Sequence, residues 1–296
     1  MSDNKTQNLI DSIKNKGKSL ESEMSFFDHI DVLRKHLLRA LAVIFVLTLG
    51  AFYFTDFIFN TIIMGPKDPS FWTYRMLCKL VEKYPSLGAD LCITRIDAKI
   101  INTEMAGQFT LQLNSCVMVG IVLGIPYLLF EIWLFVKPAL HDTERKSASG
   151  FVAFASFLFF LGILFGYYII CPLSINFLTN FTVSTEIENT FTIDSYLSSV
   201  MTLTLGSGII FQLPVIIYIL SKLGVMTPAF MRASRRYSTV LILIIAAIVT
   251  PTADPYTMLI VAMPLFLLYE LSIYISAAIE KKRNRAIYGV TKSPDA

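Results

Sequence analysis

Six long apolar runs constrain this chain more than any other feature of its sequence. They cover residues 37–63, 113–136, 151–171, 196–220, 237–249 and 258–279. A helix that rises ~1.5 Å per residue needs about 20 apolar residues to cross ~30 Å of hydrocarbon, and all but the fifth run reach that length. The fifth run covers only ~20 Å, so it requires locally thinned bilayer or the support of neighbouring helices. Because 54% of the residues are hydrophobic and 16% are charged, a soluble fold is excluded, and we predict an all-α polytopic membrane protein with six transmembrane helices.

The distribution of Lys and Arg predicts the orientation of the chain. Basic residues gather before the first run, in the connections at 137–150 and 221–236, and after the last run. The connections at 172–195 and 250–257 carry none, and the bases of the long connection at 64–112 are offset by acids. Cytoplasmic connections collect Lys and Arg, so we expect both termini to be cytoplasmic. The net charge of +3 does not indicate a nucleic-acid partner, because the bases lie at the membrane edge.

Residues 1–23 differ from the rest of the chain in composition. They are polar with mixed charges, so we expect a mobile extension. The first apolar run is too long for a cleavable signal peptide and lacks a small-residue cleavage site, so it serves as its own targeting signal.

The four cysteines fall into two classes. Cys116 and Cys171 lie in apolar runs, where a buried small apolar residue is the simplest interpretation. Cys78 and Cys92 lie in the long outer connection between the first two runs, where an oxidising compartment would let them pair. The sequence leaves that pairing open.

No enzymatic motif is visible in the sequence, which lacks His-Glu-x-x-His, Gly-x-Ser-x-Gly, a Walker loop and Cys-x-x-Cys. We therefore expect no enzyme activity, no cofactor and no metal. The functional candidates that remain are polar residues in or beside the apolar runs: Asp28, Asp31, Glu131, Glu144, Gln212, Asp254 and Glu270. An ionisable group at membrane depth costs at least ~2.5 kcal/mol, so each such group needs a reason.

Several of these residues also have a structural explanation. Asp28 and Asp31 lie at the start of a predicted helix, where carboxylates cap free N–H groups. Asp254 lies in a Thr-Pro-Thr-Ala-Asp-Pro segment, which is typical of a tight outer turn. Glu131 and Glu270 could bond to a neighbouring helix or extend to the interface instead of binding a ligand.

Gln212 lies two residues before Pro214. A proline frees backbone carbonyls within a helix. The glutamine could satisfy those carbonyls, or it could face a groove.

Glu144 has the strongest case for binding a ligand. It lies in a short polar bridge between two apolar runs, from Phe135 to Lys146, directly before Arg145 and Lys146. An acid held at the positively charged edge of a membrane protein indicates a cationic ligand.

Four motifs occur in order between residues 24 and 285. They are the run from Phe26 to Lys35; Pro126 followed by Glu131-Ile132-Trp133-x-Phe135-x-x-Pro138-Ala139-Leu140-x-x-x-Glu144-Arg145; Phe211-Gln212-Leu213-Pro214; and Thr250-Pro251-x-x-Asp254. Together they resemble TatC, the multi-spanning receptor subunit of the twin-arginine protein translocase. The resemblance implies a bacterial cytoplasmic-membrane protein with six helices over residues 24–285 in a concave, glove-like arrangement. It further implies that the last two helices are short and that residues 286–296 form a cytoplasmic tail.

The resemblance also implies a site for twin-arginine signal peptides at the cytoplasmic rim. The predicted site residues are Glu144, Arg145, Phe135, Asp31 and Arg34. A groove or partner-docking face is expected at Gln212, Glu131, Pro126 and Pro138. Structural roles in the outer loops are expected for Pro66, Asp254, Cys78 and Cys92.

Two positions depart from the family pattern. The N-terminal site usually has a glutamate where this chain has Val32, and the nearest carboxylate, Asp31, is turned by ~100° around the helix. Many members carry a glutamate where this chain has Gln212. The amide can still bind a polar group, but it cannot act as a fixed anion.

The partners follow from the same resemblance. Small single-span subunits of the TatA and TatB type dock on the helices, the chain self-associates in a larger complex within membrane lipid, and folded precursors cross under the proton-motive force. The competing class is a secondary transporter of small ions or metabolites, which also has buried acids and proline-broken helices. Its usual repeat between halves and its midplane charges are not evident in this sequence.

Overall fold

The computed structural model describes residues 26–84, 92, 99–137, 148–184, 189–249 and 255–288. The predicted extension at 1–23 lies outside these residues, and so do Pro138, Glu144, Arg145 and Asp254.

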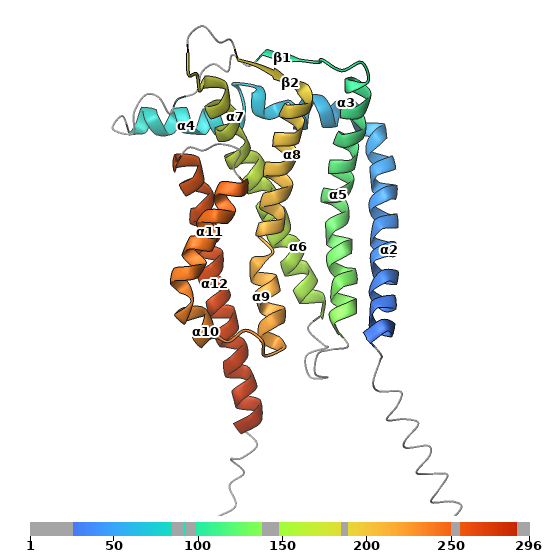
Figure 1. The fold of residues 1–296 in the computed structure, drawn as a ribbon, viewed down its shortest axis with the longest axis vertical. Helices are drawn as coiled ribbons and strands as arrows, with labels where there is room; N and C mark the ends of the chain where they lie inside the picture. Colours follow the sequence, from blue (N-terminus) through green and yellow to red (C-terminus); the bar gives the residue numbers. More distant parts are fainter. Residues whose placement is uncertain are drawn as a thin grey trace, which may run out of the picture.

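Long helices make up the body of the molecule (Figure 1). In chain order they are α2 (Phe26–Ala51), α5 (Gly107–Val136), α6 (Ala148–Phe165), α8 (Ile193–Ile210), α11 (Arg235–Val249) and α12 (Pro255–Tyr288). The start of α2 and the end of α12 lie at the same end of the bundle, which we call the terminal face (Figure 1). The opposite end, the cap face, carries the helix α4 (Trp72–Lys83) and the strands β1 (Lys99–Ile101) and β2 (Thr190–Thr192). The two strands pair in parallel.

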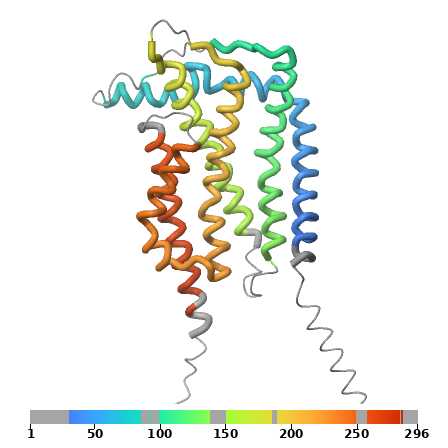
Figure 2. Tube along the Cα trace, viewed as in Figure 1, coloured from blue at the N-terminus to red at the C-terminus, as the bar shows by residue number. Residues whose placement is uncertain are grey.

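The helix contacts run from α2 at one edge to the α11–α12 pair at the other, and one hydrophobic core cluster draws members from α5, α8, α11 and α12. α2 packs against α5, α5 against α6 and α8, and α12 against α11 and against α9 (Leu213–Lys222), which follows α8. α2 and the α11–α12 pair therefore lie at opposite edges of the bundle (Figure 2). α2 contacts α5 far more than it contacts any other element, and its remaining sides expose large apolar residues such as Leu41, Phe45 and Leu49.

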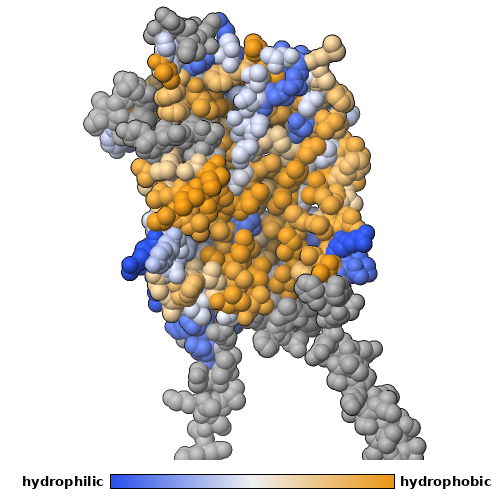
Figure 3. Space-filling view, viewed as in Figure 1, coloured by the Kyte–Doolittle hydropathy of each residue, from blue (hydrophilic) through white to orange (hydrophobic). Residues whose placement is uncertain are grey.

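On the side of the bundle that Figure 3 shows, a band of apolar residues, which we call the apolar belt, lies between the two faces. Figure 3 shows hydrophobic side chains over the middle of the molecule and hydrophilic residues toward the ends. Five helical segments within the described residues are long and apolar enough to cross a bilayer. They cover Ile30–Lys83, Gly107–Val136, Gly150–Asn180, Ile193–Lys222 and Met258–Lys282.

The last two helices differ in length. α11 has 15 residues, or about 22 Å, so the short fifth run is confirmed and a sixth complete crossing stays a prediction. α12 has 34 residues, so the prediction that both final helices are short is wrong for α12. Its apolar run is extended by Glu280, Lys281 and Lys282, which are good helix formers and continue the helix past the belt.

The first apolar run does not form one continuous α-helix. α2 ends at Ala51 and is followed by η1 (Phe52–Phe54), α3 (Thr55–Phe57) and the π-helical segment η2 (Ile58–Ile63). Irregular backbone at membrane depth needs partners for its carbonyls. The Tyr167 hydroxyl donates to the Ile62 carbonyl at 2.6 Å. The Tyr196 hydroxyl donates to the Ile63 carbonyl at 2.8 Å.

The third and fourth runs are also interrupted. α6 continues through the π-helical segment η8 (Gly166–Ile170) into α7 (Cys171–Asn180). α8 ends at Ile210, and α9 begins after Phe211 and Gln212 with Pro214 in its first turn. Proline is tolerated there because the first N–H groups of a helix have no intrahelical partner.

The cap face is organised around a buried tyrosine. The Tyr74 hydroxyl lies 2.8 Å from the carbonyl oxygen of Pro66 and 3.0 Å from that of Pro172, so it links α4 to both the segment around Pro66 and α7. Pro66 is itself buried. This arrangement places the predicted structural proline at a junction of three segments.

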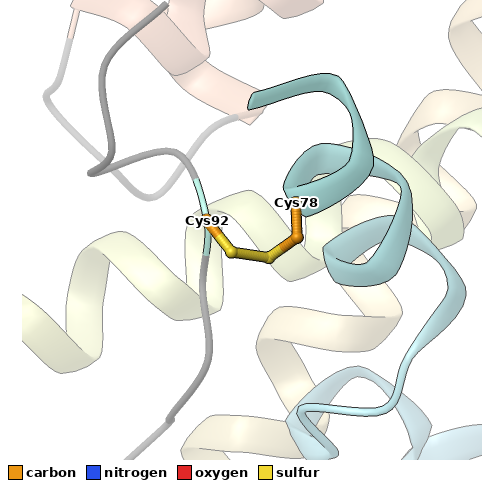
Figure 4. The surroundings of a disulfide bond; sticks show 2 residues. All are labelled: Cys78 and Cys92. Atoms are coloured by element: carbon orange, nitrogen blue, oxygen red, sulfur yellow. A yellow bond between two sulfur atoms is a disulfide. The ribbon is translucent and has the colours of Figure 1, made fainter. Parts of the chain in front are cut away.

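The cysteines divide as their positions suggested. Cys78 on α4 is joined to Cys92 by a disulfide that ties the connection after α4 back to that helix (Figure 4). Cys116 and Cys171 are free and buried, which confirms their interpretation as apolar packing residues.

Candidate rim site

The terminal face brings together two of the predicted recognition elements. The first turns of α2 carry Asp31 and Arg34, whose side chains are exposed. α5 ends at Val136, directly after the half-buried Phe135. Because α2 and α5 pack against each other, these residues lie on adjacent helix ends (Figure 1). The connection that carries Glu144 follows in sequence and lies outside the described residues.

A buried carboxylate lies one helical turn before Phe135. Glu131 is 3% exposed, and its Oε2 atom lies 2.5 Å from Nδ1 of His36 on α2. The Tyr127 hydroxyl donates to its Oε1 atom at 2.6 Å, and Arg39 adds a favourable electrostatic interaction. Both carboxylate oxygens therefore have partners inside the protein. We call Glu131, His36 and Tyr127 the rim cluster.

Small residues let α2 and α5 approach closely along the rest of their contact. A Cβ atom added at Gly120 would overlap the Thr48 side chain and lie 2.9 Å from the Thr48 backbone N and Cα atoms. A Cβ atom at Gly124 would overlap the Ile44 side chain. This Gly-x-x-x-Gly pattern is the usual device for close helix pairs in lipid. The two glycines and the rim cluster lie on the same helix pair, and the rim cluster lies nearer the terminal face than the glycines do.

Aromatic packing fixes the end of α5 against the next helices. Trp133 is 1% exposed, and its ring centroid lies 4.2 Å from that of Phe151 on α6. Phe151 in turn packs at 5.2 Å against Tyr218 on α9. The Nζ atom of Lys222 lies 5.1 Å from the centre of the Tyr218 ring. The end of α5 is thus anchored on the side away from α2.

Comparisons with known proteins agree with this arrangement. A family model described as Sec-independent protein translocase protein (TatC) matches residues 28–264. This chain belongs to the TatC family. The TatC protein of Blattabacterium sp. subsp. Periplaneta americana is 36% identical over 266 residues, which cover 90% of this chain and 100% of the relative. The TatC protein of Deinococcus radiodurans is 30% identical, with 84% of each chain covered.

Solved structures agree with the family. A crystal structure of the twin-arginine translocase receptor TatC matches with a TM-score of 0.61 and 27% identity, covering 85% of this chain and 99% of that one. A second, determined in DDM, matches with a TM-score of 0.64 and 28% identity, covering 84% and 99%. The predicted TatC resemblance, helical membrane fold and translocase function are therefore confirmed.

Gln212 lies at the break between α8 and α9 and contacts a third helix in this TatC protein. Its Nε2 atom donates to the Ala155 carbonyl of α6 at 3.2 Å, so it bonds across to another helix instead of to a carbonyl freed in its own. Its Oε1 atom is buried and has no hydrogen-bond partner in the described part of the chain. The residue therefore ties the break between α8 and α9 to α6.

The other predicted residues are distributed over the fold. Pro126 lies inside α5 and is half-buried. Glu270 on α12 accepts a bond from Arg235 on α11 at 2.8 Å. Both glutamates for which the sequence left two explanations, Glu131 and Glu270, thus bond to a neighbouring helix.

A cavity of about 850 Å³ lies in the half of the TatC bundle nearer the cap face. Its lining includes Met118 and Val122 from α5, Leu164 from α6 and Thr204 from α8. The Thr204 side chain is 2% exposed, and its Oγ1 atom has no hydrogen-bond partner in the segments that the structure describes. The cavity is separate from the rim cluster, which lies at the other end of α5.

Sequence reasoning did not single out His36. A signal was present, because His36, Ala40 and Thr48 are spaced by four and eight residues and so share one face of α2. Ala40 and Thr48 are 1% and 8% exposed, and Thr48 lies against Gly120, so this face meets α5. A histidine on a buried stripe of small residues needs a partner, and Glu131 is that partner.

Proposed function

We propose that this TatC chain is the receptor subunit of a twin-arginine translocase and binds the signal peptides of folded precursors at its terminal face. The observation that carries the proposal is the family match over residues 28–264, joined to a TM-score of 0.64 with a twin-arginine translocase receptor. The adjacency of Asp31, Arg34 and Phe135 on two packed helix ends supports placing the site there. The alternative, a secondary transporter, loses its basis, because family membership accounts for the buried acid and the broken helix.

The chemistry of recognition rests on carboxylates that hold guanidinium groups. A carboxylate binds guanidinium through two parallel hydrogen bonds, a geometry that lysine cannot reproduce. Glu131 is buried and already bonded, so it is not available to a peptide. Asp31 is exposed, and Val32 supplies no charge. We therefore assign the main arginine contact to Glu144, with Arg145 beside it and Asp31 as the nearest second carboxylate.

The orientation and the partners belong to the same proposal. The terminal face is the cytoplasmic side of a bacterial cytoplasmic membrane, with both termini cytoplasmic. Support comes from the clustering of Lys and Arg in the connections expected on that side. Small single-span Tat subunits dock on the apolar belt, several copies assemble, and the proton-motive force drives the crossing. The apolar stretch of the signal peptide is expected to run along the bundle toward the cavity that Thr204 lines.

Photo-crosslinking tests the receptor role. A precursor with a photoreactive residue beside its arginine pair is added to membranes that contain wild type, Glu144→Ala or the control Glu270→Ala. Because a hydrogen bond to a charged group contributes about 1.5–3 kcal/mol, Glu144→Ala should lower the yield by about tenfold or more. Glu270→Ala should leave it unchanged, since Glu270 lies on the far edge of the bundle.

Two results would count against the proposal. A wild type that gives no crosslink removes the receptor role. A Glu144→Ala yield equal to wild type removes the assignment of the arginine contact and leaves the receptor role in place. A precursor with two lysines in place of its arginines should crosslink weakly to every variant.

A further inference from the structure

The burial and internal hydrogen bonds of the rim cluster are not explained by direct contact with a peptide. Glu131 is 3% exposed, and each of its oxygens already has a partner within 2.6 Å. A buried carboxylate at membrane depth is costly to keep, so an apolar residue in its place would be the cheaper way to pack two helices. The cost indicates that the Glu131 carboxylate has a role that an apolar side chain could not fill.

Apolar and small-residue contacts leave the rotation of α2 weakly defined at this end. α2 packs chiefly on α5, and the residues along its outward sides are exposed. The close approach at Gly120 and Gly124 fixes the middle of the pair, but both glycines lie at least seven residues, or about 10 Å, from Glu131 along the helix. Hydrogen bonds are directional, whereas hydrophobic contact is not. The bond between His36 and Glu131 is therefore the contact best suited to set the rotation of α2 near the terminal face.

The cluster is also placed to transmit that rotation. Glu131 lies four residues before Phe135, so both side chains project from the same side of α5. His36 follows Arg34 by two residues and Asp31 by five, within one and a half turns of α2. The charged and titratable groups that face the carboxylate within the described residues are His36 and Arg39 from α2 and Tyr127 from α5. The opposite side of α5 is held by Trp133 packing on Phe151, so α5 is the fixed partner.

We propose that His36 and Glu131 are a positioning pair that sets the rotation of α2 on α5, so that Asp31, Arg34 and Phe135 meet a signal peptide together. This inference rests on the proposed function. Glu131 acts through the helix that it holds and does not contact the peptide. Tyr127 keeps the carboxylate in the orientation that His36 requires.

The test uses the full chain in lipid nanodiscs. The variants are Glu131→Gln, which keeps the volume and can still accept from Tyr127, and the exchanged pair His36→Glu with Glu131→His. Glu270→Gln removes the charge of the exposed pair between α11 and α12 and serves as the matched control. The probe is a fluorescent peptide that carries two consecutive arginines followed by an apolar stretch.

Two quantities are measured for each variant. The first is the Kd of the peptide, and the second is the distance distribution between spin labels at Lys35→Cys and Ile132→Cys, both of which replace exposed residues. We expect Glu131→Gln to broaden the distance distribution and to raise the Kd by about tenfold, which corresponds to losing roughly one charge-assisted hydrogen bond between the peptide and the misplaced end of α2. The exchanged pair should bring both quantities back toward wild type, and Glu270→Gln should change neither.

The outcomes separate the possible failures. A Kd that stays at the wild-type value in Glu131→Gln, or a raised Kd with an unchanged distance distribution, overturns the positioning role. If Glu131→Gln folds poorly, the exchanged pair decides, because a pair that restores stability but not the Kd is structural only. If wild type itself does not bind the peptide, the proposed receptor function fails and the positioning role fails with it.

Discussion

In the part of the chain that the structure describes, polar side-chain pairs join neighbouring helices at both edges of the bundle. His36 and Glu131 join α2 to α5 at an N–O distance of 2.5 Å, and Arg235 and Glu270 join α11 to α12 at 2.8 Å. The distances are similar, but the side chains of the first pair are 16% and 3% exposed and those of the second are 53% and 41% exposed. Water screens an exposed pair, so it contributes little to the free energy of unfolding. Removing one partner of a buried pair leaves the other partner buried without a hydrogen bond, which is strongly destabilising.

The helices that the two pairs join also differ in how many other contacts hold them. α12 is also held by a hydrogen bond between Ser221 and Ser276 at 2.9 Å and by the Tyr269 hydroxyl, which donates to the Met231 carbonyl at 2.8 Å. α2 rests chiefly on one neighbour. The comparison teaches that a polar side-chain pair matters most where few other contacts fix the helix that it joins.

The largest effect is expected from closing the space between α2 and α5. Gly120→Ala places a methyl group against the Thr48 side chain and within 2.9 Å of its backbone, so the helices must separate, at a cost of about 3 kcal/mol. Reversible unfolding in mixed detergent micelles measures the free energy. Gly50→Ala on α2 is the control, because nothing lies within 4 Å of its Cβ position, and it should be neutral or stabilising by about 0.5–1 kcal/mol. Equal losses in both variants would contradict the close helix contact.

A smaller effect is expected from the buried pair. A double-mutant cycle of His36→Ala and Glu131→Ala should give a coupling energy of about 2 kcal/mol in the free energy of unfolding, because a hydrogen bond to a charged group contributes roughly 1.5–3 kcal/mol. Tyr127→Phe should lower the stability of wild type but not that of the Glu131→Ala variant. A coupling energy near zero would mean that His36 and Glu131 act independently.

Much of this fold could be predicted from sequence because length and apolarity determine where helices can cross a bilayer. The second run, at 113–136, lies within α5, and the fifth run became a helix of 15 residues. The breaks were harder. Nothing in the apolar run at 37–63 marks the loss of α-helical geometry after Ala51. The carbonyls of Ile62 and Ile63 at the end of the π-helical segment bond to tyrosines more than a hundred residues away, which local sequence cannot reveal.

The rim site could be predicted only in part, for a related reason. Motif order pointed to Phe135, Asp31 and Arg34, and the structure places them on adjacent helix ends. The partner of Glu131 could not be read from its own helix, because His36 lies 95 residues earlier. Helical periodicity places His36 on the stripe of Ala40 and Thr48, but which helix that stripe meets depends on tertiary packing.

The smallest effect is expected from the exposed pair, and it completes the comparison. The same double-mutant cycle with Arg235→Ala and Glu270→Ala should give a coupling energy of only about 0.3 kcal/mol, because solvent reaches both side chains and α12 has other contacts with its neighbours. Raising the salt concentration should reduce that value further, while the coupling between His36 and Glu131 should change little, since burial limits screening. If both cycles gave the same energy and the same salt response, burial would not be what distinguishes the two edges, and the special role of the α2–α5 contact would lose its physical basis.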